Sequence, residues 1–219
     1  MLTILKYFGL AFTALLPVVN PVGSALVFLG IVGVAPAEEY RKLARKIAIS
    51  TVLFFLVIEG VGATLLAFFG ISLPVVQLAG GLVLAAMGWG LLNQSDGAAQ
   101  SGHAAVSPSY GGVEQKIFYP LTFPITAGPA CIVVMLTLSA HASSNVLLKS
   151  ALAHSGIALS VVAISYTVYL CYTYAPKLTL KISPSTVQGI LRVIAFVLLC
   201  IGVQIAWKGL EGLIQSMPK

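Results

Sequence analysis

Charged residues are scarce in this sequence. Asp, Glu, Lys and Arg make up only 8% of its 219 residues, whereas ordinary soluble domains carry about 25%. Hydrophobic residues account for 58% of the chain, and the mean hydropathy is +1.01. This composition excludes a typical soluble globular domain and indicates a protein whose main partner is the lipid bilayer.

Acidic residues are the scarcer charge type: six Asp and Glu stand against twelve Lys and Arg, which gives a net charge of +6. A basic chain could bind nucleic acid, but here the Lys and Arg residues are spread over short segments between apolar runs. We therefore expect no nucleic-acid partner. The positive charge is better explained by orientation of the chain in a membrane.

Cysteine and catalytic groups are also rare. The three cysteines, Cys131, Cys171 and Cys200, each lie alone in an apolar segment, with no CxxC motif and no histidine at ligand spacing. We expect buried free thiols, not disulfides or metal ligands. The sequence also lacks a Ser/His/Asp arrangement, a phosphate-binding loop and a pair of carboxylates. The expectation is a protein that is not an enzyme and that holds neither a cofactor nor a metal.

What the sequence has in abundance is apolar runs, and about 20 residues suffice to cross a bilayer. Six such runs predict an all-α integral membrane protein with six transmembrane helices, at residues 4–34, 46–69, 73–93, 117–140, 147–175 and 187–210. The first run shows no convincing cleavage site, so we expect it to be a retained span and not a removed signal peptide.

A long polar stretch divides the runs into two groups of three. We predict a first three-span half at residues 1–93, a cytoplasmic polar linker at 94–116 and a second half at 117–219. An odd number of spans inserts the second half upside down relative to the first, so homologous halves would form an inverted repeat. Gly81 and Gly88 correspond to Ala195 and Gly202 at an offset of 114 residues, which places small residues seven apart on both helices. The alternative is that Gly and Ala are simply common in membrane helices.

Closely spaced prolines interrupt the first run of each half. Residues 17–23 read Pro-Val-Val-Asn-Pro-Val-Gly, and residues 124–129 read Pro-Ile-Thr-Ala-Gly-Pro. Each proline removes a backbone donor and clashes with the preceding turn, so we predict that the first and fourth helices are broken near the membrane midplane. Matching breaks in two halves point to a binding site. The alternative is that the prolines only kink the helices for packing.

Broken helices leave carbonyl and amide groups without helical partners. Amides at a half-helix N-terminus suit a carboxylate, and carbonyls at a C-terminus suit an ammonium group, so a zwitterion fits both. None of the residues near the breaks is bulky, which predicts a small site. The candidate substrate-binding residues are Asn20, Pro21, Gly23, Ser24, Thr122, Thr126, Gly128 and Pro129.

Two charges, those of Glu59 and Arg192, lie inside predicted spans, where a charge is costly and therefore points to a function. Glu59 and Arg192 could pair with each other, or Glu59 could carry a proton in ion coupling. Arg192 could also snorkel to the interface. We expect His154 to be a hydrogen-bonded interface residue. Four tyrosines on one span, Tyr166, Tyr169, Tyr172 and Tyr174, are expected to anchor that span in an interfacial aromatic belt.

The distribution of positive charge predicts the orientation. Seven Lys and Arg residues fall on one side of the six spans and four on the other. The loops with more positive charge are therefore expected in the cytoplasm, with both termini outside. The seven are Arg41, Lys42, Arg45, Lys46, Lys116, Lys177 and Lys181. The cluster at residues 38–46 could contact anionic lipid, or it could simply open a solvated helix that sets the topology.

Four motifs in this order resemble the MarC family of bacterial inner-membrane proteins. They are Asn20-Pro21-Val22-Gly23, the turn at residues 69–74 followed by Leu-Ala-Gly-Gly at 78–81, the Pro-x4-Pro element at 124–129, and Cys-Ile-Gly-Val-Gln at 200–204. The resemblance covers essentially the whole chain. It implies a multi-pass inner-membrane protein with six spans and external termini, and a distant similarity to the LysE-type amino-acid exporters.

The resemblance also bears on function, because some relatives are described as transporters of small neutral amino acids such as glycine and alanine. Asn20-Pro21 and Gly128-Pro129 match the paired motifs of the family. Gln77 stands where relatives commonly have arginine, and Glu59 is not a family position, whereas Arg192 is retained.

The sequence thus predicts a transporter of small solutes that works by alternating access at a midplane site. Small neutral amino acids are the expected substrates. A non-transporting scaffold or a stress-linked accessory protein is the alternative, and a channel is a third interpretation. Homo-oligomerisation is left open.

Overall fold

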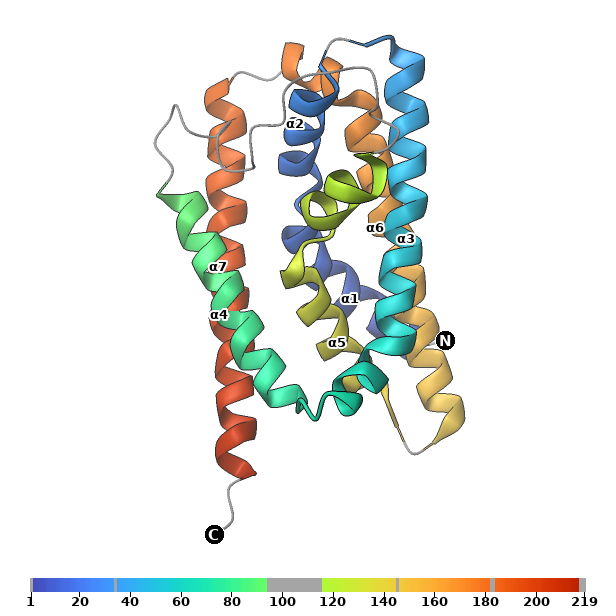
Figure 1. The fold of residues 1–219 in the computed structure, drawn as a ribbon, viewed down its shortest axis with the longest axis vertical. Helices are drawn as coiled ribbons and strands as arrows, with labels where there is room; N and C mark the ends of the chain where they lie inside the picture. The colour runs from blue at the N-terminus through green and yellow to red at the C-terminus, as the bar shows by residue number, and fades with distance from the viewer. Residues whose placement is uncertain (1, 34, 94–115, 145, 182–183, 217–219) are drawn as a thin grey trace.

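The structure is a computed structural model that describes residues 2–33, 35–93, 116–144, 146–181 and 184–216 (Figure 1). All the elements in these ranges are helical, which confirms the predicted all-α class. In chain order they are α1 (Leu2–Val19), α2 (Pro21–Val32), α3 (Ala37–Phe68), α4 (Leu73–Leu92), η2 (Ile117–Thr126), α5 (Pro129–Ala142), α6 (Leu147–Lys181) and α7 (Pro184–Gln215). Most of the predicted linker, residues 94–115, lies outside the described residues.

Four stretches of helix are long and apolar enough to cross a membrane. They are Leu2–Val32, Leu73–Leu92, Leu147–Lys177 and Gln188–Gln215. The pair formed by η2 and α5 makes a fifth if its two pieces, bent by 68°, count as one span. The prediction of a multi-pass membrane protein is therefore confirmed, and the described part of the chain accounts for four or five of the six predicted spans.

Local sequence signals explain where several helices begin and end. Pro36 precedes α3, and Glu38 and Glu39 occupy its first turn, where carboxylates favour the positive end of the helix dipole. At the other end of α3, Gly70 takes a left-handed conformation with φ of 66°. The Ile71 N–H then donates to the Leu66 carbonyl at 2.9 Å. This closure lets α4 start three residues after Gly70.

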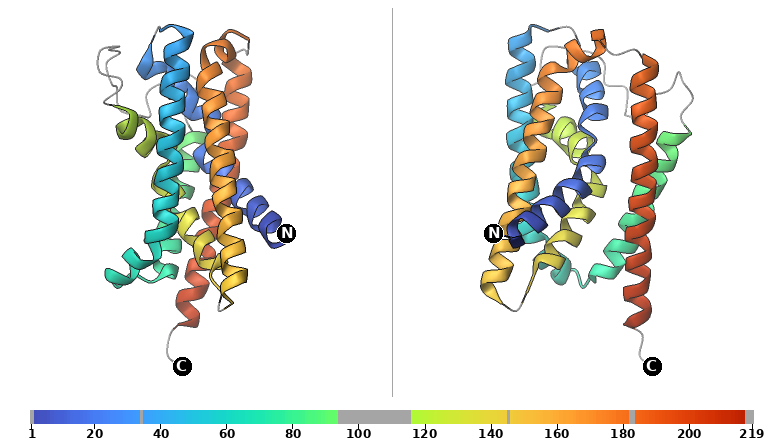
Figure 2. Two further views of the ribbon diagram at one scale, coloured as in Figure 1. Left: turned by 90° about the vertical axis from the view of Figure 1, so that its right-hand side faces the viewer. Right: turned by 180° about the vertical axis from the view of Figure 1, so that it is seen from behind.

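The two halves of the chain interlock. The broken pair α1 and α2 packs against α6, and the broken pair η2 and α5 packs against α3, so each break lies against the long helix of the other half (Figures 1 and 2). A core of apolar side chains fills the space between these helices. Its members include Leu15, Phe28, Ile47, Phe55, Ile157 and Ile164, all fully shielded from solvent.

Helices α4 and α7 form a separate pair in which the two backbones touch. A Cβ atom built on Gly81 would lie 2.3 Å from the Ala206 nitrogen, and one built on Gly88 would lie 2.6 Å from the Leu199 nitrogen. From the other side, a Cβ on Gly202 would lie 2.4 Å from the Ala85 nitrogen. The small residues expected to allow close helix approach therefore face one another across a single interface.

A methyl group at position 81 should disrupt this pair. Gly81→Ala is expected to destabilise the protein by about 1–3 kcal/mol, because the added atom forces the two backbones apart. Thermal unfolding in detergent, followed by circular dichroism, measures the effect. Gly90→Ala is the matched control on the same helix, since nothing lies within 4 Å of that position. Equal stability of the two variants would contradict the backbone contact.

Helix ends gather at two ends of the molecule. Helices α2 and α6 end, and α3 and α7 begin, at the upper end of Figure 1, whereas α1 begins and α7 ends in its lower half (Figures 1 and 2). The upper end therefore carries the basic start of α3, with Arg41, Lys42, Arg45 and Lys46.

Candidate functional site

The first break separates α1 from α2 at Asn20. This residue has φ of 46° and ψ of 64°, a left-handed conformation that asparagine adopts more readily than other non-glycine residues. Its Oδ1 accepts a hydrogen bond of 3.1 Å from the Gly23 N–H and so caps α2. Pro21 has no N–H, so it cannot satisfy the Pro17 carbonyl one turn earlier. The predicted break is present, and the Pro17 carbonyl at the end of the first half-helix lacks its usual helical donor.

The second break is built differently, from a tandem repeat of aromatic, proline, aliphatic and threonine residues at 119–122 and 123–126. The aromatic residues Tyr119 and Phe123 are extended, which interrupts the helical path of η2. Each threonine hydroxyl donates to the carbonyl five residues earlier. Thr122 bonds Ile117 at 2.8 Å, and Thr126 bonds Leu121 at 2.6 Å. Threonine hydroxyls thus supply donors in a segment where prolines remove them.

Helix α5 begins at Pro129 immediately after this segment. Gly128 is its N-cap residue and offers no side-chain cap. A Cβ atom on Gly128 would lie 3.1 Å from the Pro124 carbonyl oxygen, so the close approach of the chain favours glycine. Pro129 has no N–H, and the Cys131 N–H donates to the Gly128 carbonyl oxygen at 2.9 Å. The start of α5 is the positive end of its helix dipole. The start of α5 is therefore suited to a carboxylate.

Ser24 joins the two breaks. Its Oγ lies 2.8 Å from the Val19 carbonyl oxygen and 2.9 Å from that of Asn20, at the end of α1. It also lies 3.4 Å from the Ile125 carbonyl oxygen in the other half of the chain. In a regular helix the N–H of residue 129 would bond that carbonyl, but residue 129 is proline. The hydroxyl has a single proton and the Val19 carbonyl oxygen is its nearest acceptor, so the longer approach to Ile125 shows that the two breaks are in contact at Ser24.

Tyr172 holds the junction from the side of α6. Its hydroxyl lies 2.7 Å from the Thr126 Oγ1, and its ring stacks on Phe28 of α2 with centroids 4.5 Å apart. The side chain is fully buried. Our prediction that Tyr172 anchors an interfacial belt is therefore wrong, although Tyr166 and Tyr174 are exposed as a belt requires. The missed signal is helical spacing, which puts Tyr172 on the buried face that includes Ile157 and Ile164.

The hydrogen bond between Thr126 and Tyr172 should be measurable in a double-mutant cycle. Thr126→Val and Tyr172→Phe each remove one hydroxyl with little change in shape. Their effects on the free energy of unfolding should be coupled by about 0.6–1.7 kcal/mol, the range found for such bonds between membrane helices. Thr126→Val combined with Tyr166→Phe is the control, because Tyr166 is 60% exposed. Additive effects of the first pair would contradict the bond.

The structure brings most of the predicted binding residues to this junction. Asn20, Pro21, Gly23 and Ser24 form the first break, and Thr126 and Gly128 form the second. Thr122 is fully buried one turn earlier, with its hydroxyl bonded within η2. Pro129 starts α5 and is itself exposed. The paired breaks are therefore one place in the fold and not two separate kinks.

Glu59 and Arg192 do not meet. They belong to α3 and α7, which lie on opposite sides of the molecule in Figure 1. The partner of the Glu59 carboxylate is His154 of α6, whose Nδ1 lies 3.1 Å from Glu59 Oε1. Arg192 is exposed on α7. Gln77 is buried on α4.

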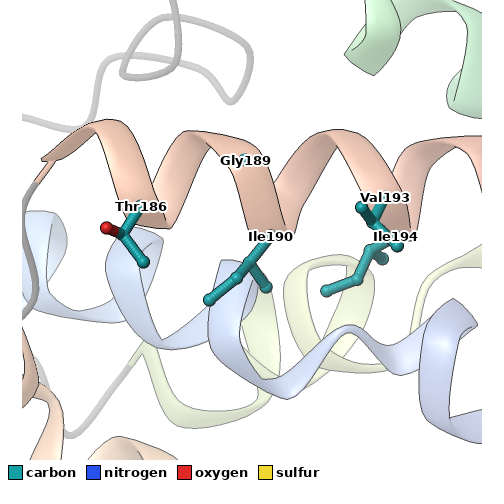
Figure 3. A pocket seen from close by; sticks show the side chains of 5 residues that line it. All are labelled: Thr186, Gly189, Ile190, Val193 and Ile194. Carbon is teal, nitrogen blue, oxygen red and sulfur yellow. The ribbon is translucent and has the colours of Figure 1, made fainter.

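A pocket of about 460 Å³ opens beside the first half of α7 (Figure 3). It is lined by Thr186, Gly189, Ile190, Val193 and Ile194. In Figure 3 the side chains of Ile190 and Ile194 project from α7 toward the N-terminal helices. Ile194 also packs in one apolar cluster with Val18, which is two residues before Asn20. All five lining residues belong to α7, and Ile194 is the one that packs toward the first break, whereas Thr186, Gly189, Ile190 and Val193 are exposed.

Comparison with known proteins assigns the chain to a family. Residues 5–214 match the family described as MarC family integral membrane protein. The chain belongs to the MarC family. The match covers the residues of both breaks and nearly all the described helices.

Curated MarC relatives resemble the chain over nearly its whole length. A UPF0056 membrane protein of Pyrococcus horikoshii is 25% identical over 212 residues, which are 97% of this chain and 98% of the relative. The UPF0056 inner membrane protein MarC of Salmonella typhimurium is 24% identical over 219 residues, or 99% of each chain. The protein of that name from Citrobacter koseri is 25% identical over the same share. No solved structure matches the chain.

Proposed function

We propose that this protein transports small neutral amino acids, such as glycine and alanine, by alternating access at the junction of its two breaks. The observation that carries the proposal is the link between Ser24 and the Ile125 carbonyl, which brings two proline-broken segments from different halves of the chain together. Broken helices that meet inside a membrane protein are the usual construction of a transporter binding site. A scaffold has no need of two such junctions at one place.

The contacts of α4 and α7 support an arrangement of six spans in two inverted halves, with α3 as the sixth span. Under the offset of 114 residues, Gly81 corresponds to Ala195 and Gly88 to Gly202. Gly81 contacts Gly202, and Gly88 contacts Ala195. When each residue is replaced by its counterpart in the other half, the first contact becomes the second. A two-fold relation between the halves has this consequence. The order of elements, with two short pieces followed by two long helices, is also the same in each half.

The chemistry of the junction fits a small zwitterion. The uncapped start of α5 would receive the carboxylate, and the carbonyls at the end of α1, including that of Pro17, would receive the ammonium group. The Asn20 side chain offers both a donor and an acceptor. Gly23 and Ala127 leave little room for a large side chain, because a Cβ on Gly23 would already lie 2.3 Å from the Asn20 side chain.

The α4–α7 pair is the proposed movable wall. Val18 precedes the first break and Ala130 follows the second, and both pack in one apolar cluster with Leu84 of α4 and Leu198 of α7. Thr126 and Ala127 are fully shielded from solvent, so the junction is closed in this conformation. Displacement of α4 and α7 as one unit would open it, and the pocket along α7 would be the route of access.

We place the protein in the bacterial inner membrane, where the names of the relatives from Salmonella and Citrobacter put them. The basic end of α3 and the linker would face the cytoplasm, with both termini outside. The protein would use no catalytic residue, cofactor or metal, because transport of this kind needs only binding and a change of conformation.

Purified protein in liposomes should exchange radiolabelled alanine for internal alanine. Saturable counterflow is expected, because an alternating-access carrier that changes conformation with alanine bound exchanges internal alanine for external alanine. Flux that rises linearly with concentration and shows no counterflow would indicate a channel. Absence of flux with glycine, alanine and serine in both gradient directions would overturn transport and favour the scaffold.

Asn20 provides a sharper test of the site. Asn20→Ala should raise the apparent KM for alanine about tenfold or more, because it removes the polar side chain and strains a left-handed position. Asn20→Gly keeps that conformation accessible and isolates the loss of the side chain. Asn93→Ala at the exposed end of α4 is the matched control. A KM unchanged in both Asn20 variants would place the site elsewhere.

A further inference from the structure

Another polar contact between the two halves lies away from the breaks. His154 Nδ1 is 3.1 Å from Glu59 Oε1, which joins α6 to α3 across 95 residues of sequence. The Glu59 side chain is only 9% exposed and the His154 side chain is 32% exposed. An acid of this kind within an apolar helix is a functional candidate, because an isolated charge there is unfavourable.

The surroundings of Glu59 offer little else that is polar. From α5, the Ser139 hydroxyl lies 3.4 Å from the Glu59 carbonyl oxygen and Leu136 packs on Gly62. His141 is the titratable group on that part of α5, and its Nδ1 lies 2.7 Å from the Thr137 carbonyl oxygen. The third helix against α3, η2, meets it at Phe54, more than one turn before Glu59. His154 is therefore the partner that the structure gives to the carboxylate.

Histidine opposite a carboxylate makes this contact suited to a proton. Imidazole titrates near neutral pH, and a carboxylate and an imidazole within hydrogen-bond distance share one proton that either can hold. A metal ion would need more ligands, and among the described residues no group of three His, Cys, Asp or Glu side chains comes together. A carboxylate and an imidazole at this distance are the groups expected of a proton-binding site.

The pair also lies where a proton could influence the breaks. Helix α6 packs against α1 and α2, and α3 packs against η2 and α5. Tyr172 of α6 contacts Thr126 of the second break. Helix α6 thus supports the first break and α3 supports the second. A change in the attraction between α3 and α6 therefore acts on the helices that support both breaks.

We infer that the juxtaposed Glu59 and His154 form a proton-binding site that couples movement of a proton to movement of the solute. This inference rests on the proposed transport function and names its coupling ion. Proton binding alters the contact between α3 and α6, and the contact in turn biases which side the junction opens to. Solute and proton are carried at two places in one fold.

Proton binding at Glu59 can be measured without transport. Infrared difference spectra of the detergent-solubilised protein, recorded between pH 5 and pH 8, should contain a carboxylic-acid C=O band that Glu59→Gln removes. His154→Asn, which keeps a donor at the place of Nδ1, should shift the midpoint of that band by about one pH unit or more. Glu211→Gln, on α7, is the matched control and should leave the band unchanged. A band absent from the parent protein, or retained in Glu59→Gln, would overturn the inference.

Coupling is measured in liposomes that contain a pH indicator. Alanine added outside, in sodium-free buffer, should bring protons inside at about one per alanine. The ratio should fall to near zero in Glu59→Gln and stay near one in Glu211→Gln. Alanine flux without proton flux in the parent protein, or with an unchanged ratio in Glu59→Gln, overturns the inference and leaves transport standing. A parent protein that moves no alanine contradicts the proposed function instead, and the infrared band then decides the proton site alone.

Discussion

The structure depends on two missing hydrogen-bond donors. Proline at positions 21 and 129 deprives the carbonyls of Pro17 and Ile125 of their helical partners, and an unsatisfied backbone group in the hydrocarbon region costs several kcal/mol. The Ser24 Oγ, whose nearest acceptor is the Val19 carbonyl oxygen, also comes within 3.4 Å of the Ile125 carbonyl oxygen across the junction. In the proposed function, the same deficit provides the polar backbone that a solute would contact.

The rest of the fold holds this junction in place. Long helices α3 and α6 each support the break of the opposite half, and Tyr172 fixes the second break through its hydroxyl while its ring packs on α2. The α4–α7 pair lies against both breaks through an apolar cluster, and its own two helices are held by backbone contact. The proposed movement would occur at the boundary between this pair and the junction, where the contacts include apolar side chains of one cluster.

Local effects were predictable from the sequence, and partners distant in the chain were not. Proline acts on the turn that contains it, so both breaks and the all-α class could be predicted. Small residues at 81, 88, 195 and 202 predicted close approach, but not that α4 and α7 approach each other. Tyr172 and His154 were both assigned to the interface, because sequence position does not reveal which helix lies opposite. Their partners, Thr126 and Glu59, are 46 and 95 residues away.

The central claim is that the two breaks form one binding site. Its most direct test is protection of single cysteines introduced at Ser24 and at Thr126 into a cysteine-free background. The rate of modification by a small thiol reagent is measured at increasing alanine concentration. The account predicts that alanine slows modification at both positions, with the same half-maximal concentration at each. Protection at only one position, or two clearly different half-maximal concentrations, would contradict a single shared site.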